Sequence, residues 1–135
     1  MTKGDVREYI LIIEDEDDVA RALLRTLHRA GYHATVAKNV DDVFSALEQR
    51  TPDVVVLDGS LPVVGGVEIV QILRGKHATK KTPILFLTAD SDASQRLAAS
   101  GVGADVFMTK PYRAEELVGR VQFLLAHRRA ANTPG

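Results

Sequence analysis

The sequence predicts an α/β fold with a five-stranded, doubly wound parallel sheet whose two faces are both covered by helices. Short apolar runs alternate with segments of helical period five times along the chain. Within the runs, apolar residues occupy consecutive positions instead of alternate ones, which is typical of strands buried on both sheet faces. Right-handed crossovers between such strands produce an open sheet with five helices.

Five runs are the predicted strands. Four of them are strongly apolar, and the second is the weakest candidate. In chain order, the strands are expected at residues 9–13, 33–37, 54–57, 84–87 and 106–109.

Apolar residues at helical spacing predict the intervening helices. The first helix carries Val19, Leu23 and Leu27 at every fourth position, and Gly31 provides a natural stop. The second lies behind Asn39, a residue type that commonly caps a helix N-terminus.

The later helices differ in the strength of their signal. The third should fade by Gly75. The fourth, between Thr88 and Val106, is poorly patterned because Leu97 is its only large apolar residue. The last is clear and ends in His127-Arg128-Arg129, whose cations suit the negative end of the helix dipole.

One domain of ordinary size accounts for the 135 residues. We expect an N-terminal extension at residues 1–8, the folded domain at 9–129, and a flexible tail or the start of a linker at 130–135. A free end and a linker would both suit this last segment, so a longer chain stays open.

Composition excludes several classes of function. The chain has no cysteine, which rules out disulfides, thiol catalysis and thiolate metal sites. Its net charge of −1 gives no electrostatic basis for binding nucleic acid or an acidic membrane surface. No apolar stretch approaches the roughly 20 residues that span a bilayer, and the first residues lack the apolar core of a secretory signal. A cytoplasmic protein is therefore expected.

Polar side chains follow four of the predicted strands. These are Glu14-Asp15, Asp58, Thr88 and Lys110. Parallel strands bring them to one edge of the sheet, where ligands of open α/β sheets bind. Clustered acids repel one another and an incoming phosphoryl group, and Mg²⁺, which prefers oxygen ligands, removes both objections. The sequence therefore predicts a magnesium and phosphoryl site.

Each of these residues also has a plainer interpretation. Asp58 alone would more often be a cap or loop residue, and Lys110-Pro111 could simply end a strand. The acidic run could cap and charge the N-terminus of the first helix, and Asp17 or Asp18 is expected to do so. The joint occurrence of all these residues at strand ends favours the functional interpretation.

From about Arg7 to Arg129 the sequence resembles the receiver domain of the bacterial two-component response-regulator family. The resemblance is carried by Glu14-Asp15, Asp58, Leu61-Pro62 with Gly66, Thr88-Ala89 and Lys110-Pro111, in this order and each near a strand end. It implies a flavodoxin-like sheet with strand order 2-1-3-4-5.

The resemblance implies a role for each site residue. Asp58 would accept a phosphoryl group from a phosphohistidine on a histidine kinase or histidine phosphotransfer protein. Asp15 and Asp58 would bind Mg²⁺ directly with the backbone carbonyl of Ser60, and Glu14 would act mostly through water. Lys110 would pair with the phosphoryl oxygens. The only catalysis expected is the domain's own magnesium-dependent phosphorylation and dephosphorylation.

The resemblance also implies a switch. Thr88 would donate a hydrogen bond to the phosphoryl group, and Phe107 would rotate inward behind it. The surface formed by the fourth helix, fifth strand and fifth helix would report the change. The alternative is that Phe107 always stays in the core and does not act as a switch. Ser60 and Asp90 resemble positions that tune the lifetime of the phosphorylated state.

Three residues depart from the family pattern. Glu14 stands where Asp is more common, which displaces the carboxylate by roughly 1.5 Å, about one C–C bond. Gly65 replaces a common Asp, and Arg113 replaces a common Asp or Ser cap, at a loss of about 1 kcal/mol of helix stabilisation.

Two other functions remain open to test. A receiver-like interaction module would share the fold without ever being phosphorylated. A magnesium phosphatase of the haloacid dehalogenase type is disfavoured because Ser60 stands where such enzymes need a second Asp. A downstream protein or a tethered output domain is the expected target, with no direct contact to nucleic acid or membrane. A homodimer through the last helix stays open as an alternative, without a distinct motif to support it, and the sequence does not reveal the pathway.

Overall fold

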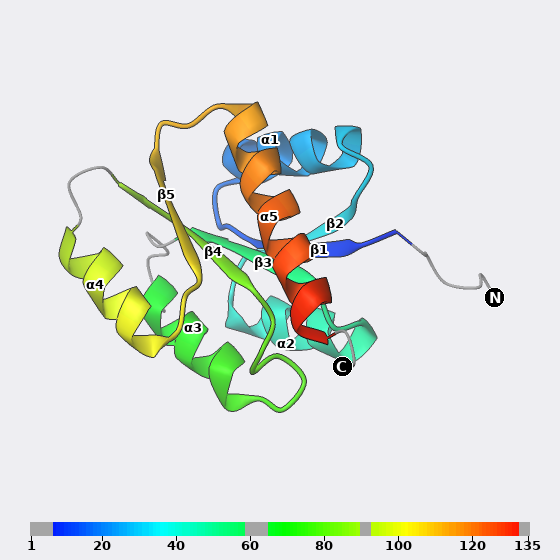
Figure 1. Cartoon of the computed structure of the whole chain (residues 1–135). Coiled ribbons are helices and arrows are strands. Elements are labelled where there is room, and N and C mark those ends of the chain that lie inside the picture. The colour runs from blue at the N-terminus through cyan, green and yellow to red at the C-terminus, as the bar shows by residue number, and fades with distance from the viewer. Residues whose placement is uncertain (1–6, 59–64, 90–92, 133–135) are drawn as a thin grey trace.

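The computed structural model describes residues 7–58, 65–89 and 93–132 and contains the predicted parallel sheet (Figure 1). Its strand order is β2-β1-β3-β4-β5, and each neighbouring pair is parallel, which confirms the predicted order. The strands are β1 Tyr9–Ile13, β2 His33–Ala37, β3 Val54–Asp58, β4 Ile84–Ala89 and β5 Val106–Lys110.

Helices cover both faces of this sheet. In Figure 1, α1 and α5 lie on one face, and α2, α3 and α4 lie on the other. Two separate clusters of buried apolar side chains correspond to these two faces. The helices are α1 Asp17–Arg29, α2 Val40–Gln49, α3 Gly66–Gly75, α4 Ala93–Val102 and α5 Ala114–Asn132.

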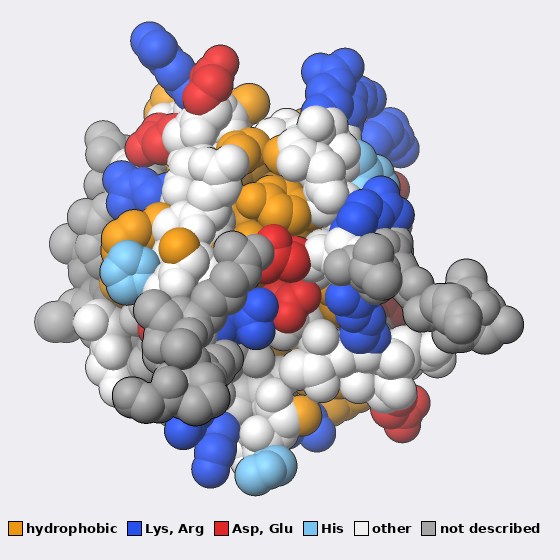
Figure 2. Space-filling model, turned by 45° about the vertical axis from the view of Figure 1, so that its right-hand side comes forward, with side chains coloured by type: hydrophobic (Ala, Val, Ile, Leu, Met, Phe, Trp, Pro, Cys, Tyr) orange, Lys and Arg blue, Asp and Glu red, His pale blue; other side chains and the backbone are white. Residues whose placement is uncertain are grey.

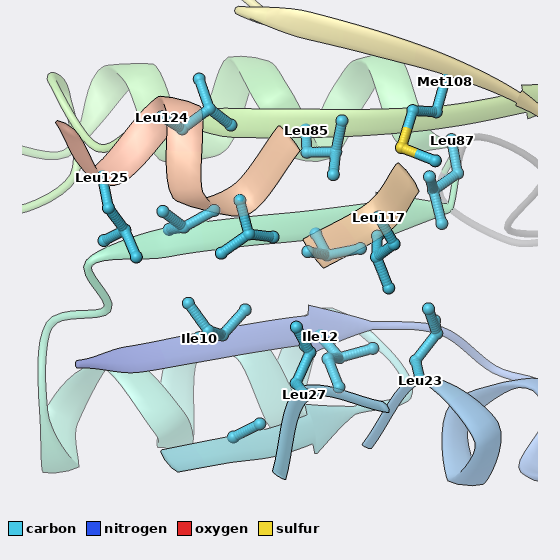
Figure 3. Close-up of a cluster of buried hydrophobic side chains, with 14 residues drawn as sticks. Ile10, Ile12, Leu23, Leu27, Leu85, Leu87, Met108, Leu117, Leu124 and Leu125 are labelled. Carbon is cyan, nitrogen blue, oxygen red and sulfur yellow. The ribbon is translucent and has the colours of Figure 1, made fainter. Parts of the chain in front are cut away.

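Burial of both faces of the sheet explains why apolar residues occupy consecutive positions in the strands. Ile10 and Ile12 of β1 belong to the cluster under α1 and α5, whereas Leu11 and Ile13 belong to the cluster under the other three helices. Successive side chains of a strand point to opposite faces, and here both faces are covered. Figure 3 shows Ile10 and Ile12 beside side chains of α1 and α5, among them Leu27.

Three strands continue further than the sequence predicted. β3 includes Asp58, β4 includes Thr88 and Ala89, and β5 includes Lys110. The parallel register pairs Thr88 with Thr109 and Ala89 with Lys110. These polar residues therefore belong to the strands themselves, which restricts their backbones more than a loop would.

The start of α1 differs from the expectation. The residue that caps it is Glu16, whose side chain makes no capping hydrogen bond, and Asp17 and Asp18 lie inside the first turn. They place negative charge at the positive end of the helix but do not cap it. Asp17 pairs instead with Lys38, and this contact lowers the pKa of its carboxyl.

Other local predictions are confirmed. Asn39 caps α2, because its side chain accepts a hydrogen bond from the Asp42 amide at 2.8 Å. Gly31 follows the end of α1 with a φ of 95°, a backbone conformation that favours glycine. α3 ends at Gly75, as its apolar pattern indicated.

Regular secondary structure and its hydrogen bonds extend slightly beyond residues 9–129 at both ends of the described chain. α5 continues to Asn132, so residues 130–132 are helical, while 133–135 lie outside the described residues. At the other end, the Glu8 carbonyl accepts a hydrogen bond from His33 at 3.0 Å. Residue 8 therefore already continues the ladder between β1 and β2.

Ion pairs join the chain ends at the edge where the strands begin. Arg128 of α5 lies 3.3 Å from Asp53 and 3.8 Å from Glu8, and Asp53 also accepts a hydrogen bond from the Tyr9 amide at 2.7 Å. Figure 2 turns this side of the molecule forward, and acidic side chains meet Lys and Arg side chains near the middle of the view. These contacts fix the last turns of α5 against the sheet.

In the part of the chain that the structure describes, no helix is both long and apolar enough to cross a membrane.

Candidate functional site

The carboxyl ends of β1, β3 and β5 bring Glu14, Asp58 and Lys110 together. β3 lies between β1 and β4, so Asp58 ends a central strand of the sheet. Glu14 directly follows β1, and its amide still donates to the Ala37 carbonyl at 3.0 Å. This geometry confirms that the sequence-predicted polar residues share one sheet edge.

Asp58 is buried and paired with Lys110. Its side chain is only 4% exposed, and the Lys110 Nζ lies 2.8 Å from its Oδ2. The lysine side chain remains 34% exposed, so its ammonium reaches the carboxylate from the surface. A buried carboxylate without a partner would be costly, and the lysine supplies that partner.

Glu14 is even more deeply buried, with 1% of its surface exposed. Its Oε2 accepts a hydrogen bond from the Glu16 amide at 3.2 Å, but its buried Oε1 has no hydrogen-bond partner among the described residues. Burial, followed by a side-chain hydrogen bond with Asp58, raises the pKa of Glu14 to about 8. Two ionised carboxylates have no proton to share. A hydrogen bond between Glu14 and Asp58 therefore requires one of the two groups to be protonated.

An unpartnered carboxylate oxygen beside a second carboxylate fits a divalent cation. Oxygen ligands of this kind suit Mg²⁺, which needs no thiolate or imidazole. The complete predicted ligand set is not assembled, however, because no group of three acidic or histidine side chains in the described ranges could hold a metal ion. Asp15 is half-buried next to Glu14. Ser60, whose carbonyl was the remaining predicted ligand, lies outside the described residues.

Thr88 and Phe107, the predicted switch pair, lie on neighbouring strands. Thr88 is 2% exposed, and its hydroxyl donates a long hydrogen bond of 3.4 Å to the Ala89 carbonyl. Phe107 is half-buried, and its ring centre lies 5.8 Å from that of the fully buried Phe86. Its ring therefore packs against the core on the face of α2, α3 and α4.

Tyr112 is a site residue that the sequence reasoning missed. It is half-buried against the apolar cluster under α1 and α5. Burial, then the charges of Glu14 and Asp58, raise the pKa of its phenol to about 12. An aromatic residue just after Lys110-Pro111 was the available signal. Tyr112 packs against this cluster, and its phenol lies close enough to both acids for their charges to affect it.

The comparisons with known proteins agree with this geometry. Residues 10–122 match the model of the response regulator receiver domain. The phosphate regulon transcriptional regulatory protein PhoB of Pseudomonas aeruginosa is 33% identical over 89% of this chain and 52% of its own length. The transcriptional regulatory protein PrrA of Mycobacterium tuberculosis is 36% identical over 98% of this chain and 56% of its own length.

Solved structures show the same relationship. A putative response regulator from Chloroflexus aurantiacus has a TM-score of 0.83 and 34% identity, covering 89% of this chain and 98% of its own. The chemotaxis response regulator CheY4 of Vibrio cholerae has a TM-score of 0.82 and 28% identity, covering 89% of this chain and all of its own.

The fold and the site together define a class of protein: doubly wound parallel α/β domains with acids and a lysine at the carboxyl ends of their strands. This chain belongs to the response regulator receiver domain family, and it is a receiver domain of two-component signal transduction. It spans about half the length of the curated relatives that it matches. Receiver domains are not conventional enzymes, and response regulators interact with histidine kinases and output domains.

Proposed function

We propose that this domain takes a phosphoryl group onto Asp58 from a phosphohistidine of a histidine kinase or histidine phosphotransfer protein, with Mg²⁺ bound beside it. The observation that carries the proposal is the buried Asp58 carboxylate, held 2.8 Å from the Lys110 ammonium next to the unpartnered Glu14 oxygen. A nucleophile, a counter-charge and a second carboxyl group, which a cation could bind after displacing its proton, thus lie together.

In the proposed transfer, an Asp58 carboxylate oxygen attacks phosphorus and an O–P bond forms. The P–N bond to the donor imidazole breaks, and its electron pair stays on the imidazole nitrogen, which then takes a proton. Lys110 leaves its pairing with Asp58 to hold a phosphoryl oxygen as a point charge. The protein contributes position and electrostatics and little covalent chemistry of its own.

Magnesium, when bound, neutralises the charge of the acids and of the transferred group. Asp15, Asp58 and the Ser60 carbonyl would hold it directly, with Glu14 acting through water. The three carboxylates do not form a metal cluster in the described arrangement, so metal binding would require their side chains to come closer together. Thr88 would donate a hydrogen bond from its hydroxyl to a phosphoryl oxygen, which requires it to give up the long hydrogen bond to the Ala89 carbonyl.

The test is the intact mass of the protein after incubation with Mg²⁺ and acetyl phosphate. We expect one added phosphoryl group in the parent protein, and none without Mg²⁺ or in Asp58→Asn. Hydrolysis during the experiment could hide the adduct, so beryllofluoride, a stable phosphoryl mimic, is added in parallel.

The same test separates the proposal from the alternative of a non-phosphorylated interaction module. If neither an adduct nor beryllofluoride binding is found while the protein is folded, the module becomes the better interpretation. An adduct that persists in Asp58→Asn would place the acceptor elsewhere and contradict the assignment.

The groove between α1 and α5 is the proposed docking site of the phosphohistidine donor. Two adjoining hollows of about 400 and 370 Å³ run along these helices and share Thr26 and Ala114. The first is lined by Asp18 at its acidic end and by Tyr112, which follows the site lysine. A helical donor lying in this groove would bring its phosphohistidine toward Asp58.

Ala22→Arg tests this docking site. Ala22 lines the groove but is exposed, so an arginine is tolerated by α1 and fills the groove. Phosphorylation by a panel of phosphorylated histidine kinases should fall about tenfold or more, the effect of losing roughly 1.4 kcal/mol of binding. Phosphorylation by acetyl phosphate should stay unchanged. Equal rates with both kinds of donor would contradict the docking site.

The downstream effect would be carried by α4, β5 and α5, with Phe107 packed inward behind Thr88 in the phosphorylated state. Phosphorylation can shift this surface only by differential contacts, here those of Thr88 and Lys110 with the phosphoryl group. The relatives PhoB and PrrA are named as transcriptional regulatory proteins, and about half of their length lies outside this match. We therefore infer a cytoplasmic regulator whose output is a tethered domain or a partner protein.

A further inference from the structure

A hollow of about 470 Å³ lies at the edge of the sheet where β3, β4 and β5 begin. Its lining includes the residues that directly precede these strands, which are Asp53, Pro83 and Asp105. The C-terminal part of α5 and the connection between α3 and β4 also line it, and both lie at the lower end of the molecule in Figure 1. The five residues of β3 span roughly 17 Å, so this strand-start hollow is separate from the phosphoryl site at the opposite edge.

The first acid of the lining, Asp53, is already occupied by other groups of the protein. Its Oδ2 accepts a hydrogen bond from the Tyr9 amide at 2.7 Å and lies 3.8 Å from the Arg50 Nη2. Its Oδ1 lies 3.3 Å from the Arg128 Nη2. Arg50 does not line the hollow, so it offsets the charge of Asp53 from outside.

The second acid, Asp105, is neutralised by Arg74 at the end of α3. The Arg74 Nη2 donates to Asp105 at 2.8 Å, and its Nε and Nη2 both donate to the Gly103 carbonyl, at 3.1 and 2.9 Å. Its Nη1 donates to the carbonyls of Thr79 and Thr82, at 3.0 and 2.7 Å. Since a guanidinium has five N–H donors, groups of the protein saturate Arg74, which also lies outside the lining.

Two cations of the lining keep donors for a further acceptor. The exposed Lys81 makes no ion pair with another residue in the described ranges. The Arg128 Nη2 lies 3.3 Å from Asp53 and 3.8 Å from Glu8, and both distances exceed the about 2.7–2.9 Å of a good charged hydrogen bond. Its buried Nε has no hydrogen-bond partner among the described residues. Unlike Arg74, Arg128 is therefore not saturated by the protein.

The apolar part of the lining favours a ligand with an organic body. Pro52, Pro83 and Leu124 are buried residues that contribute to it. Sites for small molecules commonly measure about 300–1,000 Å³, so an inorganic anion would leave most of this hollow unfilled. Removing apolar surface of the ligand and of these side chains from water would add to the affinity.

We propose that the strand-start hollow binds a small organic anion, with a carboxylate or phosphate monoester group beside Lys81 and Arg128. The apolar body of the ligand packs against Pro52, Pro83 and Leu124. Both acids of the lining are engaged by donors of the protein, so the unmatched charge that the ligand meets is positive. Binding at this edge does not depend on phosphorylation of Asp58.

The site is tested by titrating the ¹⁵N-labelled protein with phenyl phosphate and with benzoate, in the absence of Mg²⁺. We expect saturable shifts of the amides of residues 53, 81 and 105. Phenyl phosphate should bind about tenfold more tightly than inorganic phosphate, because only its ring buries apolar surface. Neutral benzyl alcohol should not saturate the site. Shifts that centre on Asp58 and Lys110, or equal affinities for phenyl phosphate and inorganic phosphate, would overturn the proposal.

Variants of adjacent lysines then separate a site from a general attraction of anions to a basic segment. Lys81→Met should weaken the binding of phenyl phosphate about tenfold, because a charged hydrogen bond is lost. Lys80→Met is the matched control, since Lys80 is equally exposed but does not line the hollow, and its affinity should stay within about twofold. Arg128→Lys keeps the charge without the fork and should weaken binding about threefold or more. Equal affinities of Lys81→Met and the parent, or equal losses in the two lysine variants, would mean an adventitious ion only and would overturn the site.

Discussion

Replacing Lys110 with methionine should lower the free energy of unfolding by about 2 kcal/mol near neutral pH and slow phosphorylation about 100-fold or more. Asp58 is buried, and Lys110 is the cation that contacts its Oδ2. Removing one partner of a buried pair leaves a desolvated charge, which usually costs about 3–5 kcal/mol; the partial exposure of Lys110 reduces this figure. Denaturant unfolding and intact mass with acetyl phosphate measure the two effects.

Lys38→Met is the matched control for this prediction. Lys38 pairs with Asp17 near the same end of the sheet, but both side chains are more than half exposed, at 52% and 62%. Exposed pairs contribute roughly 0–1 kcal/mol, so this variant should unfold and react almost like the parent protein.

The double variant Asp58→Asn/Lys110→Met separates charge from packing. Without the carboxylate, the lysine has no buried charge to neutralise, so most of the lost stability should return. If Lys110→Met loses stability to the same extent in both backgrounds, the lysine acts through its packing and the interpretation of a buried ion pair is wrong. Equal phosphorylation rates in Lys110→Met and the parent would contradict its role in the transfer.

Much of the fold was predictable because each of its determinants is local. The apolar run of β1 and the alternation of strands with helices are direct consequences of a sheet buried on both faces. The convergence of Asp58, Thr88 and Lys110 follows from the parallel direction of the strands that carry them. Even the weakly patterned α4 forms a helix: three of its ten residues are alanine, the residue with the highest helix propensity, and Ala99 is fully buried in the core.

The features that were not predicted depend on three-dimensional contacts. The cap of α1 was assigned to the wrong acid, because several acids in a row offer equivalent caps and the chain direction after β1 decides among them. The five hydrogen bonds of the Arg74 guanidinium had no signal in the sequence, since three of their four acceptor atoms are backbone carbonyls in the α3–β4 and α4–β5 connections. Tyr112 follows β5 by two residues, and only the path of the chain after this strand brings its phenol near Glu14 and Asp58.

The protonation of Glu14 also could not be predicted from the sequence. It makes the free energy of unfolding depend on pH. An unfolded glutamate loses its proton near 4.5, whereas Glu14 in the folded protein keeps its proton up to about 8. Between these values the folded state binds more protons than the unfolded state, so rising pH favours unfolding. The stabilisation is complete below about 4.5 and is lost as pH rises through about 8.

In metal-free buffer, the free energy of unfolding should therefore fall by about 2 kcal/mol between mildly acidic and mildly alkaline pH. The shift of the Glu14 pKa from 4.5 to about 8, at about 1.4 kcal/mol per pKa unit, would by itself give a larger change in the free energy of unfolding. Glu14 and Asp58 titrate as a pair, however, and share the effect. Glu14→Gln should remove most of this dependence, because its amide can donate to Asp58 while its oxygen still accepts from the Glu16 amide. Glu115→Gln, an exposed acid of α5, is the control. A parent protein whose stability does not fall over this pH range would contradict the raised pKa.

With Mg²⁺ bound, the free energy of unfolding should rise with pH instead of falling. This reversal links the titration of Glu14 to the proposed magnesium site. A cation held beside Glu14, even through water, favours the ionised form of its carboxyl, so Mg²⁺ should displace its proton, and about one proton per protein should be released on binding near pH 7. Calorimetry in buffers of different ionisation enthalpy measures this release directly. Glu14→Gln should bind Mg²⁺ more weakly and release almost no proton, whereas Glu115→Gln should behave like the parent. Binding without proton release in the parent would mean that Glu14 is already ionised, and the paired-carboxyl description of the site would have to be abandoned.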